Sequence, residues 1–156
     1  MNQSKIQNHK SKIIKILIVD DDQRMTRTLK DILTVKGYEA DVARSGNEAI
    51  EKMAETHFDC LLSDIKMHGI NGVELFRATK KSRPDLPVVL MTAYAHDELV
   101  KDVLEEGILA VLTKPLDINA LLSFFAALRK ELLQPLTKIS RQELARILGQ
   151  PIGKRK

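Results

Sequence analysis

The sequence predicts an α/β fold, in which a parallel five-stranded sheet carries helices on both faces. Two observations lead to this prediction. Five short apolar runs alternate with amphipathic stretches over residues 13–133, and such alternation favours parallel strands joined by right-handed helical crossovers. Three of the apolar runs are nearly continuous, which is typical of strands buried on both faces of a parallel sheet.

The predicted strands are the apolar runs themselves. They are Ile13–Asp20, Glu39–Ala43, Cys60–Asp64, Val88–Thr92 and Leu109–Thr113. In an open parallel sheet, ligands bind beyond the carboxyl ends of the strands. The residues at which these runs end are therefore the first place to look for function.

The predicted helices begin and end at recognisable capping residues. The first, 24–36, has an apolar face and is followed by Gly37, a common helix stop; its apolar face consists of Met25, Leu29, Ile32 and Leu33. The second begins at Ser45, which has the capping-box spacing to Glu48, and runs to about Thr56. The remaining helices are 72–81, 97–106 and 118–133. Asp22 and Asp117 are further N-cap candidates, and Gln134-Pro135 ends the last helix.

Length and composition favour one globular domain with short extensions. The chain has 156 residues, of which 44% are hydrophobic and 4% aromatic, so the core has to be aliphatic. A single cysteine, Cys60, excludes an internal disulfide and a thiolate zinc site, and we interpret it as a buried apolar residue. Residues 1–12 lack the apolar region of a signal peptide, and no apolar run approaches the ~18 residues of a membrane span. We therefore expect a cytoplasmic protein without membrane contact.

Charge is distributed unevenly along the chain. Residues 1–15 carry +4 and residues 129–156 carry +6, which leaves −6 for residues 16–128 of the net +4. This pattern predicts a flexible basic N-terminal segment (1–12), an acidic domain (13–133) and a basic tail (134–156). A second capping-box spacing, from Ser140 to Glu143, predicts a short helix over 141–148.

Chemically distinctive side chains fall at four of the predicted strand ends. The first strand ends in Asp20-Asp21-Asp22, the third in Asp64, the fourth in Thr92 and the fifth in Lys114-Pro115. Carboxylates at close range repel one another and need a cation, and oxygen ligands of this kind suit Mg²⁺. A hydroxyl and an ammonium nearby suit a phosphoryl group. Taken singly, Asp20 and Asp21 could equally cap a helix, Thr92 could be an ordinary strand-end residue, and Lys114-Pro115 could form a turn with a cis bond.

Four segments together resemble the receiver domains of two-component response regulators, the CheY-like superfamily. They are Ile16–Asp22, Leu61–Met67 with Gly69 and Gly72, Met91–Ala93 and Thr113–Pro115. The resemblance spans roughly residues 13–130. It implies a flavodoxin-like sheet of strand order 2-1-3-4-5 and assigns residues 13–133 to the receiver domain.

The resemblance also implies a phosphorylation site. Asp64 is then the phospho-acceptor, which takes a phosphoryl group from a histidine kinase or a phosphotransfer protein. Thr92 and Lys114 are the residues that bind oxygens of the phosphorylated Asp64. A domain of this kind is not an enzyme with a separate substrate, because it catalyses only its own phosphotransfer and dephosphorylation.

The resemblance implies a Mg²⁺ site as well. Asp20, Asp21 and Asp64 are the carboxylates around the ion, and of the first two Asp21 is favoured as the direct ligand. The backbone carbonyl of Lys66 is the fourth protein group. Mg²⁺ is the one cofactor that the resemblance implies.

Three residues depart from the family pattern, and one bears on signalling. His68 stands where proline is usual, and Leu116 where phenylalanine is common. Val111 stands where an aromatic switch residue is usual. The readout of phosphorylation is therefore expected to run through the loop after Thr92 and the helix from about Asp97. The expected face for a downstream partner or a homodimer consists of the helix 97–106, the strand Leu109–Thr113 and the helix 118–133.

Two other functions are compatible with parts of the sequence. A DNA-associated regulator would use the basic residues of the tail, which lack the interleaved aromatics and the recognition-helix pattern of sequence readout; these residues are Lys138, Arg141, Arg146, Lys154, Arg155 and Lys156. A haloacid-dehalogenase-like phosphatase would need a second aspartate two residues after the nucleophile. Lys66 occupies that position. Phosphorelay signalling through protein contacts is the function we expect.

Overall fold

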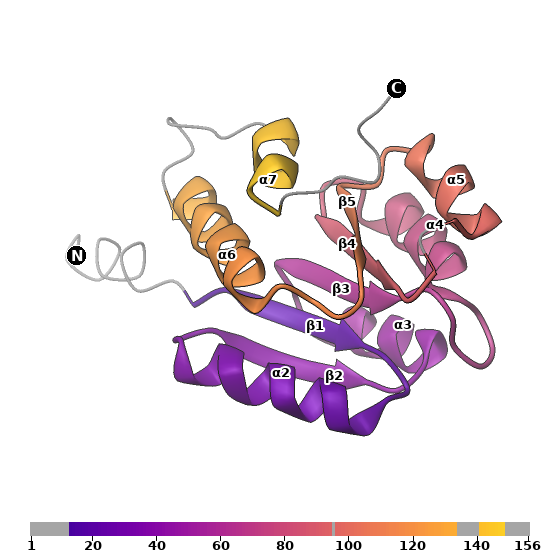
Figure 1. Ribbon diagram of the computed structural model, residues 1–156. Coiled ribbons are helices and arrows are strands. Elements are labelled where there is room, and N and C mark those ends of the chain that lie inside the picture. Colours follow the sequence, from indigo (N-terminus) through magenta and orange to yellow (C-terminus); the bar gives the residue numbers. More distant parts are fainter. Residues whose placement is uncertain (1–12, 95, 134–140, 149–156) are drawn as a thin grey trace.

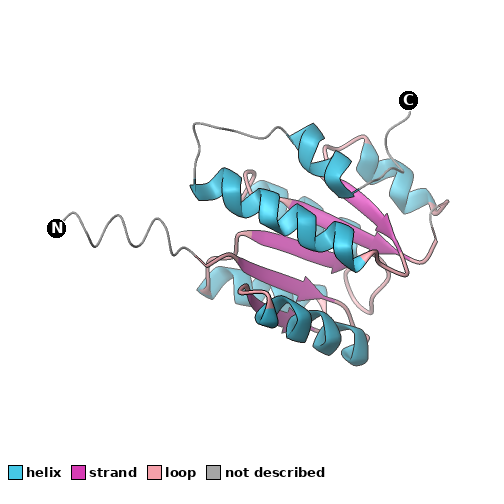
Figure 2. Ribbon diagram, turned by 60° about the vertical axis from the view of Figure 1, so that its left-hand side comes forward, coloured by secondary structure: helices cyan, strands magenta, loops and turns pink. Residues whose placement is uncertain are grey.

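A computed structural model describes residues 13–94, 96–133 and 141–148. Over these residues the chain forms a five-stranded parallel sheet of order β2-β1-β3-β4-β5, with helices on both faces (Figures 1 and 2). The fold class and the strand order predicted from the sequence are both confirmed.

The helices and strands lie close to their predicted positions. The strands are β1 (Lys15–Val19), β2 (Glu39–Ala43), β3 (Cys60–Asp64), β4 (Val88–Thr92) and β5 (Ala110–Thr113). The helices are α2 (Gln23–Val35), α3 (Gly46–Glu55), α4 (Gly72–Ser82), α5 (Glu98–Leu104), α6 (Ile118–Leu133) and α7 (Arg141–Leu148). β1 is shorter than predicted, because its ladder with β2 begins at the pair Lys15–Glu39. α5 is shorter because Asp97 is its N-cap and the chain turns at Gly107, whose φ is +88°.

Two apolar cores lie on opposite faces of the sheet, because alternate side chains of each strand point to opposite faces. One core contains Ile16 and Ile18 of β1 together with residues of α2, α6 and α7. The other contains Leu17 and Val19 of β1 together with residues of α3, α4 and α5. Cys60 is fully buried in the first core, as predicted. Because helices cover both faces of the sheet, polar residues can lie at its carboxyl edge.

The predicted N-caps are present. The carboxylate of Asp22 accepts hydrogen bonds from two backbone N–H groups of the first turn of α2, and Asp117 caps α6 in a similar way. The hydroxyl of Ser45 accepts from the backbone N–H of Glu48. The carboxylate of Glu48 accepts from the N–H of Arg44, so the reciprocal half of this capping box is displaced by one residue.

Helix α7 packs on the domain. It contacts α6 and β5, and its residues Leu144 and Leu148 are buried in the same core as α2 and α6. This helix occupies the range in which the sequence predicts a short helix. The segment 1–12 and the rest of the basic tail, 134–140 and 149–156, lie outside the described residues. Within the described ranges, none of the helices combines the length and the apolar character needed to cross a bilayer.

Gly72 packs closely against the backbone at the end of β3. A Cβ at this position would lie 2.9 Å from the Cα of Ile65, and closer still to the carbonyl oxygen of Asp64. We expect Gly72→Ala to destabilise the fold by about 2–4 kcal/mol, because rigid backbone has to move to admit the methyl group. Urea denaturation measures this loss.

Gly46→Ala is the matched control, because Gly46 is likewise the first residue of its helix. The closest atoms to its added Cβ would be side-chain carbons of Ile70, which can turn away, and the backbone carbonyl oxygen of Ile70 lies at an ordinary contact distance of 3.4 Å. The loss should therefore be smaller than for Gly72→Ala. Equal losses in the two variants would contradict this explanation.

The docking of α7 generates a second prediction. Leu144→Ala should lower the free energy of unfolding by about 2–4 kcal/mol, because it leaves a cavity in the core beneath α7. Ile147→Ala, on the same helix but 36% exposed, should cost well under 1 kcal/mol. If denaturant melts give the same stability for both variants, α7 is not part of the cooperative unit.

Candidate functional site

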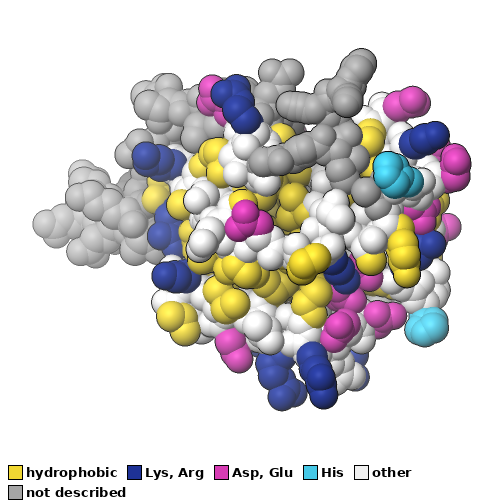
Figure 3. Space-filling model, in the orientation of Figure 1, with side chains coloured by type: hydrophobic (Ala, Val, Ile, Leu, Met, Phe, Trp, Pro, Cys, Tyr) yellow, Lys and Arg dark blue, Asp and Glu magenta, His cyan; other side chains and the backbone are white. Residues whose placement is uncertain are grey.

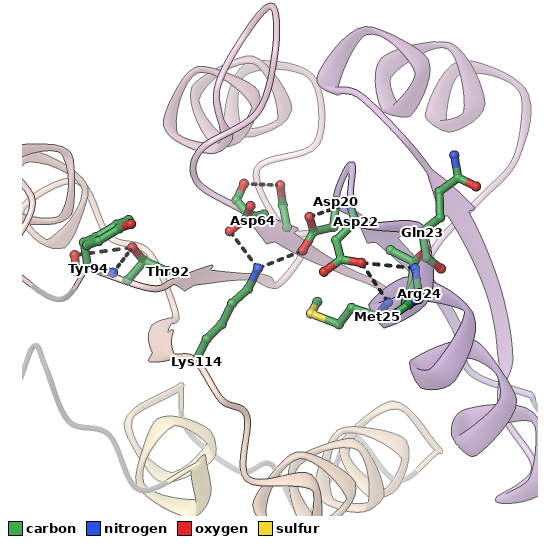
Figure 4. Close-up of polar contacts among 11 residues, drawn as sticks. Asp20, Asp22, Gln23, Arg24, Met25, Asp64, Thr92, Tyr94 and Lys114 are labelled. Atoms are coloured by element: carbon green, nitrogen blue, oxygen red, sulfur yellow. Dashed lines mark hydrogen bonds and ion pairs between the residues drawn. The ribbon is translucent and has the colours of Figure 1, made fainter.

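The carboxyl ends of β1, β3, β4 and β5 bring the predicted site residues to one edge of the sheet. Asp20 directly follows β1, Asp64 is the last residue of β3, and Thr92 is the last residue of β4. Lys114 directly follows β5. Figure 4 shows Asp20, Asp64 and Lys114 turned toward one another, while Thr92 points to its own loop.

Three carboxylates form an acidic cluster. Oxygen atoms of Asp20, Asp21 and Asp64 lie within 4.8 Å of one another. Asp20 is 1% exposed and Asp64 8% exposed, whereas Asp21 faces solvent. Asp22, the third aspartate of the run, turns away to cap α2. The sequence therefore predicted correctly which aspartates meet and which one serves the helix.

Lys114 links two of these carboxylates. Its Nζ lies 2.9 Å from Oδ2 of Asp20 and 3.3 Å from Oδ1 of Asp64. The backbone N–H of Lys114 donates to the carbonyl of Thr92, 2.8 Å away, which fixes the end of β5 beside β4. The peptide bond between Lys114 and Pro115 is cis, one of the two forms considered from the sequence.

Burial and charge leave this site with unbalanced negative charge. Burial raises the pKa of Asp64, the neighbouring charge of Asp20 raises it further, and Lys114 offsets part of the rise. Burial alone would lower the pKa of Lys114, but the hydrogen bond and charge of Asp20, together with Asp64, outweigh it and raise the pKa. Among the described contacts, the Lys114 ammonium pairs with two of the three carboxylates of the cluster. Acidic side chains gather on the same side of the molecule, to which the strand arrows of Figure 1 point (Figure 3).

The donor set of the cluster fits a hard divalent cation. It consists of carboxylate oxygens, which Mg²⁺ prefers, and one side of it is open at Asp21. A second positive charge would also relieve the repulsion that raises the pKa of Asp64. The residues present are therefore suited to hold such an ion.

Thr92 lies at the predicted strand end, but its hydroxyl is engaged elsewhere. The Oγ1 atom accepts a hydrogen bond from the N–H of Tyr94 at 2.9 Å and donates to the carbonyl of Tyr94 at 3.3 Å. The side chain is buried, with the residue 1% exposed. In this conformation Thr92 belongs to its own loop and makes no described contact with Asp64.

The side chain of Lys66 has a role that the sequence analysis missed. Its Nζ forms an ion pair with Oδ2 of Asp97 at 2.9 Å and lies 5.5 Å from the ring centroid of Tyr94. The hydrogen bond to the Leu99 N–H, and then the contact with Lys66, lower the pKa of Asp97. The same ion pair raises the pKa of Lys66. No local sequence pattern relates these residues, because they come from two different loops.

The three departures from the family pattern have different environments. His68 is exposed in the loop after β3, next to Gly69, whose φ is +78°. Leu116 is partly buried against the core that contains α6. Val111 is 2% exposed and belongs to the other core, together with Val100 and Val103 of α5.

Comparison with known proteins agrees with this geometry. The family model of the response regulator receiver domain matches residues 16–126. The transcriptional regulatory protein ZraR of Klebsiella oxytoca is 38% identical over 108 residues, which are 69% of this chain and 24% of that protein. The regulatory protein AtoC of Escherichia coli is 34% identical over 109 residues, again 24% of its length. The chain thus spans about a quarter of the length of these curated relatives.

Solved structures show the same similarity. A receiver domain protein from Methanospirillum hungatei superposes with a TM-score of 0.70 at 33% identity, covering 80% of this chain and 97% of that one. The response regulator protein TrrA of Thermotoga maritima, solved in complex with Mg²⁺ and BeF, gives a TM-score of 0.67 at 31% identity and covers 74% and 99% of the two chains. On the fold, the site and these matches together, the chain belongs to the response regulator receiver domains, the signalling domains of two-component phosphorelays.

Proposed function

We propose that Asp64 accepts a phosphoryl group from a histidine kinase or a phosphotransfer protein in a Mg²⁺-dependent reaction, and that the change is passed on through protein contacts. The observation that carries this proposal is the position of Asp64. It ends a buried strand within a cluster of carboxylates, with the Lys114 ammonium 3.3 Å from one of its oxygens.

The chemistry requires little beyond positioning and charge neutralisation. An oxygen of the Asp64 carboxylate attacks phosphorus, a new O–P bond forms, and the bond from phosphorus to the donor imidazole nitrogen breaks. Lys114 is placed to neutralise oxygens of the transferred group, because its Nζ already lies beside Asp64. When bound, Mg²⁺ would supply the remaining positive charge. Thr92 can contribute its hydroxyl after its hydrogen bonds to Tyr94 break.

The metal would be held by groups from two loops. Asp21 and Asp64 offer carboxylate oxygens directly, and Asp20 completes the acidic surroundings while it binds Lys114. The backbone carbonyl of Lys66 is the further proposed ligand. The relative TrrA, which was solved with Mg²⁺ and BeF, supports this assignment by its similarity.

The partner surface is proposed on α5, β5 and α6. Helix α7 already contacts α6 and β5, so it would form part of any interface there. We also propose that residues 13–133 are the receiver domain and act in the cytoplasm, and that the domain turns over no substrate other than its own phosphoryl group.

The acceptor assignment can be tested by intact-mass spectrometry. Incubation with acetyl phosphate and Mg²⁺ should add one phosphoryl group to the chain, and Asp64→Asn should abolish the addition because the amide is not nucleophilic. Asp59→Asn is the matched control, because Asp59 is also 8% exposed and lies just before the opposite end of β3. Labelling of the Asp64 variant at the level of the control would disprove the assignment.

The metal assignment can be tested by calorimetric titration with Mg²⁺. Asp21→Ala should weaken binding about tenfold or more, because it removes one of three carboxylates from a site with few protein ligands. Asp22→Asn should change the affinity little, because Asp22 lies outside the cluster and asparagine retains the cap of α2. Equal affinities in wild type and Asp21→Ala would rule out the acidic cluster as the site.

The affinity for Mg²⁺ measured in the same titration should fall as the pH is lowered. Protons compete with Mg²⁺ for Asp64, and the pKa of Asp64 is raised above its usual 3.8. Binding should therefore weaken as the pH falls toward that raised value, before ordinary aspartates are protonated.

A further inference from the structure

A second ion pair stands beside the proposed phosphorylation site and plays no part in the chemistry above. It joins Lys66, in the loop that follows β3, to Asp97, the residue that caps α5. Lys66 is two residues from Asp64. Its side chain therefore connects the neighbourhood of the acceptor with the start of α5.

Hydrogen bonds are formed at both ends of the segment between Thr92 and α5. At one end, the Thr92 hydroxyl forms two hydrogen bonds with the backbone of Tyr94. At the other, Asp97 donates its N–H to the carbonyl of Tyr94 at 3.1 Å, and its carboxylate caps the Leu99 N–H at 2.9 Å. Lys66 contacts both Asp97 and the Tyr94 ring. Residues that hold Tyr94 in place therefore also hold the Thr92 hydroxyl away from Asp64.

Phosphorylation would oppose this arrangement in two ways. The Thr92 hydroxyl has to leave Tyr94 before it can reach a phosphoryl oxygen. The phosphoryl group also adds negative charge near Lys66, whose Cα is at most about 7 Å from that of Asp64 along the chain. This charge competes with Asp97 for the ammonium of Lys66.

We propose, on the basis of the proposed phosphorylation of Asp64, that Lys66 and Asp97 are positioning residues. Their ion pair, with Tyr94 packed against Lys66, holds the loop after Thr92 in its resting conformation. Loss of this contact carries the signal to the first turn of α5. Lys66 acts here through its side chain, which is separate from the backbone carbonyl proposed as a metal ligand.

The environment of Val111 favours this route over a movement of β5. Val111 is enclosed with Val100 and Val103 of α5, and its short β-branched side chain has few rotamers. It cannot swing over a large distance. The loop from Thr92 to Asp97 is the direct covalent connection between the site and α5.

The test uses substitutions that break the ion pair and leave other contacts intact. Lys66→Met removes the ammonium but retains an apolar stem. Asp97→Asn removes the charge but keeps a good N-cap for α5. The double variant completes a mutant cycle, and Lys66→Arg restores a cation at position 66. Lys52→Met is the control away from the loop, because it removes an ammonium that is paired with Asp41 at 3.1 Å.

Tyr94 provides the readout. The chain contains no tryptophan and two tyrosines, so in a Tyr38→Phe background tyrosine fluorescence reports Tyr94, which is 63% exposed. The full-length chain is titrated with beryllofluoride in the presence of Mg²⁺, and the midpoint is recorded. The Asp64 phosphoryl content after acetyl phosphate is measured on the same variants.

Each single substitution should lower the midpoint by about two- to fivefold, the range expected for loss of an exposed ion pair. The double variant should shift it no further than either single variant, and Lys66→Arg and Lys52→Met should match wild type. Unchanged or raised midpoints for the two single variants, or additive effects in the double variant, overturn the inference. If wild type is phosphorylated on Asp64 and the pair variants behave like it, the inference is wrong and the proposed function stands. If wild type takes up no phosphoryl group, both are wrong.

Discussion

Three carboxylates that repel one another lie together at the carboxyl edge of the sheet. Asp20, Asp21 and Asp64 have oxygens within 4.8 Å of one another, and two of these residues are buried. Such a cluster is unfavourable without positive charge. Apolar cores on both faces of the sheet hold β1 and β3 in register and so keep the acids together against their repulsion. The site is therefore maintained by packing elsewhere in the domain, and its unbalanced negative charge favours a bound cation beside Lys114.

Two lysines from different elements lie near Asp64 and have different partners. Lys114 comes from the end of β5 and reaches across the sheet edge to Asp20 and Asp64, so it joins the last strand to the first and third. Lys66 comes from the loop just after Asp64 and points to Asp97 instead. The Lys114 ammonium offsets negative charge in the acidic cluster, and the Lys66 ammonium contacts a neighbouring loop. Closeness in sequence to Asp64 thus does not indicate which lysine acts on it.

Local patterns predicted much of this architecture, whereas contacts between separate elements could not be predicted from them. The apolar runs gave the strands, and Asp22 and Ser45 marked helix starts, because capping depends on residues two or three positions apart. A full capping box between Asn71 and Glu74 was overlooked although its spacing is visible in the sequence. The Thr92 hydroxyl bonds within its own loop, to Tyr94 two residues further on, and the strand-end position of Thr92 gave no indication of that. The partner of Lys66 could not be predicted, because it depends on how two separate loops meet. The burial of Leu144 and Leu148 depends in the same way on the position of α7 against α6 and β5.

The packing of α7 bears on how this domain can be cut for expression. The match to the family model ends at residue 126, inside α6, whereas the core continues through Leu128 to Leu144 and Leu148. A fragment trimmed to the family boundary would lack the last turns of α6 and all of α7, and it would expose to water the side chains of β5 and α6 that these segments cover. Newly exposed apolar surface beside an edge strand is a common origin of aggregation. In this chain, the match to the family model ends before the packed core does, and solubility is expected to follow the extent of the core.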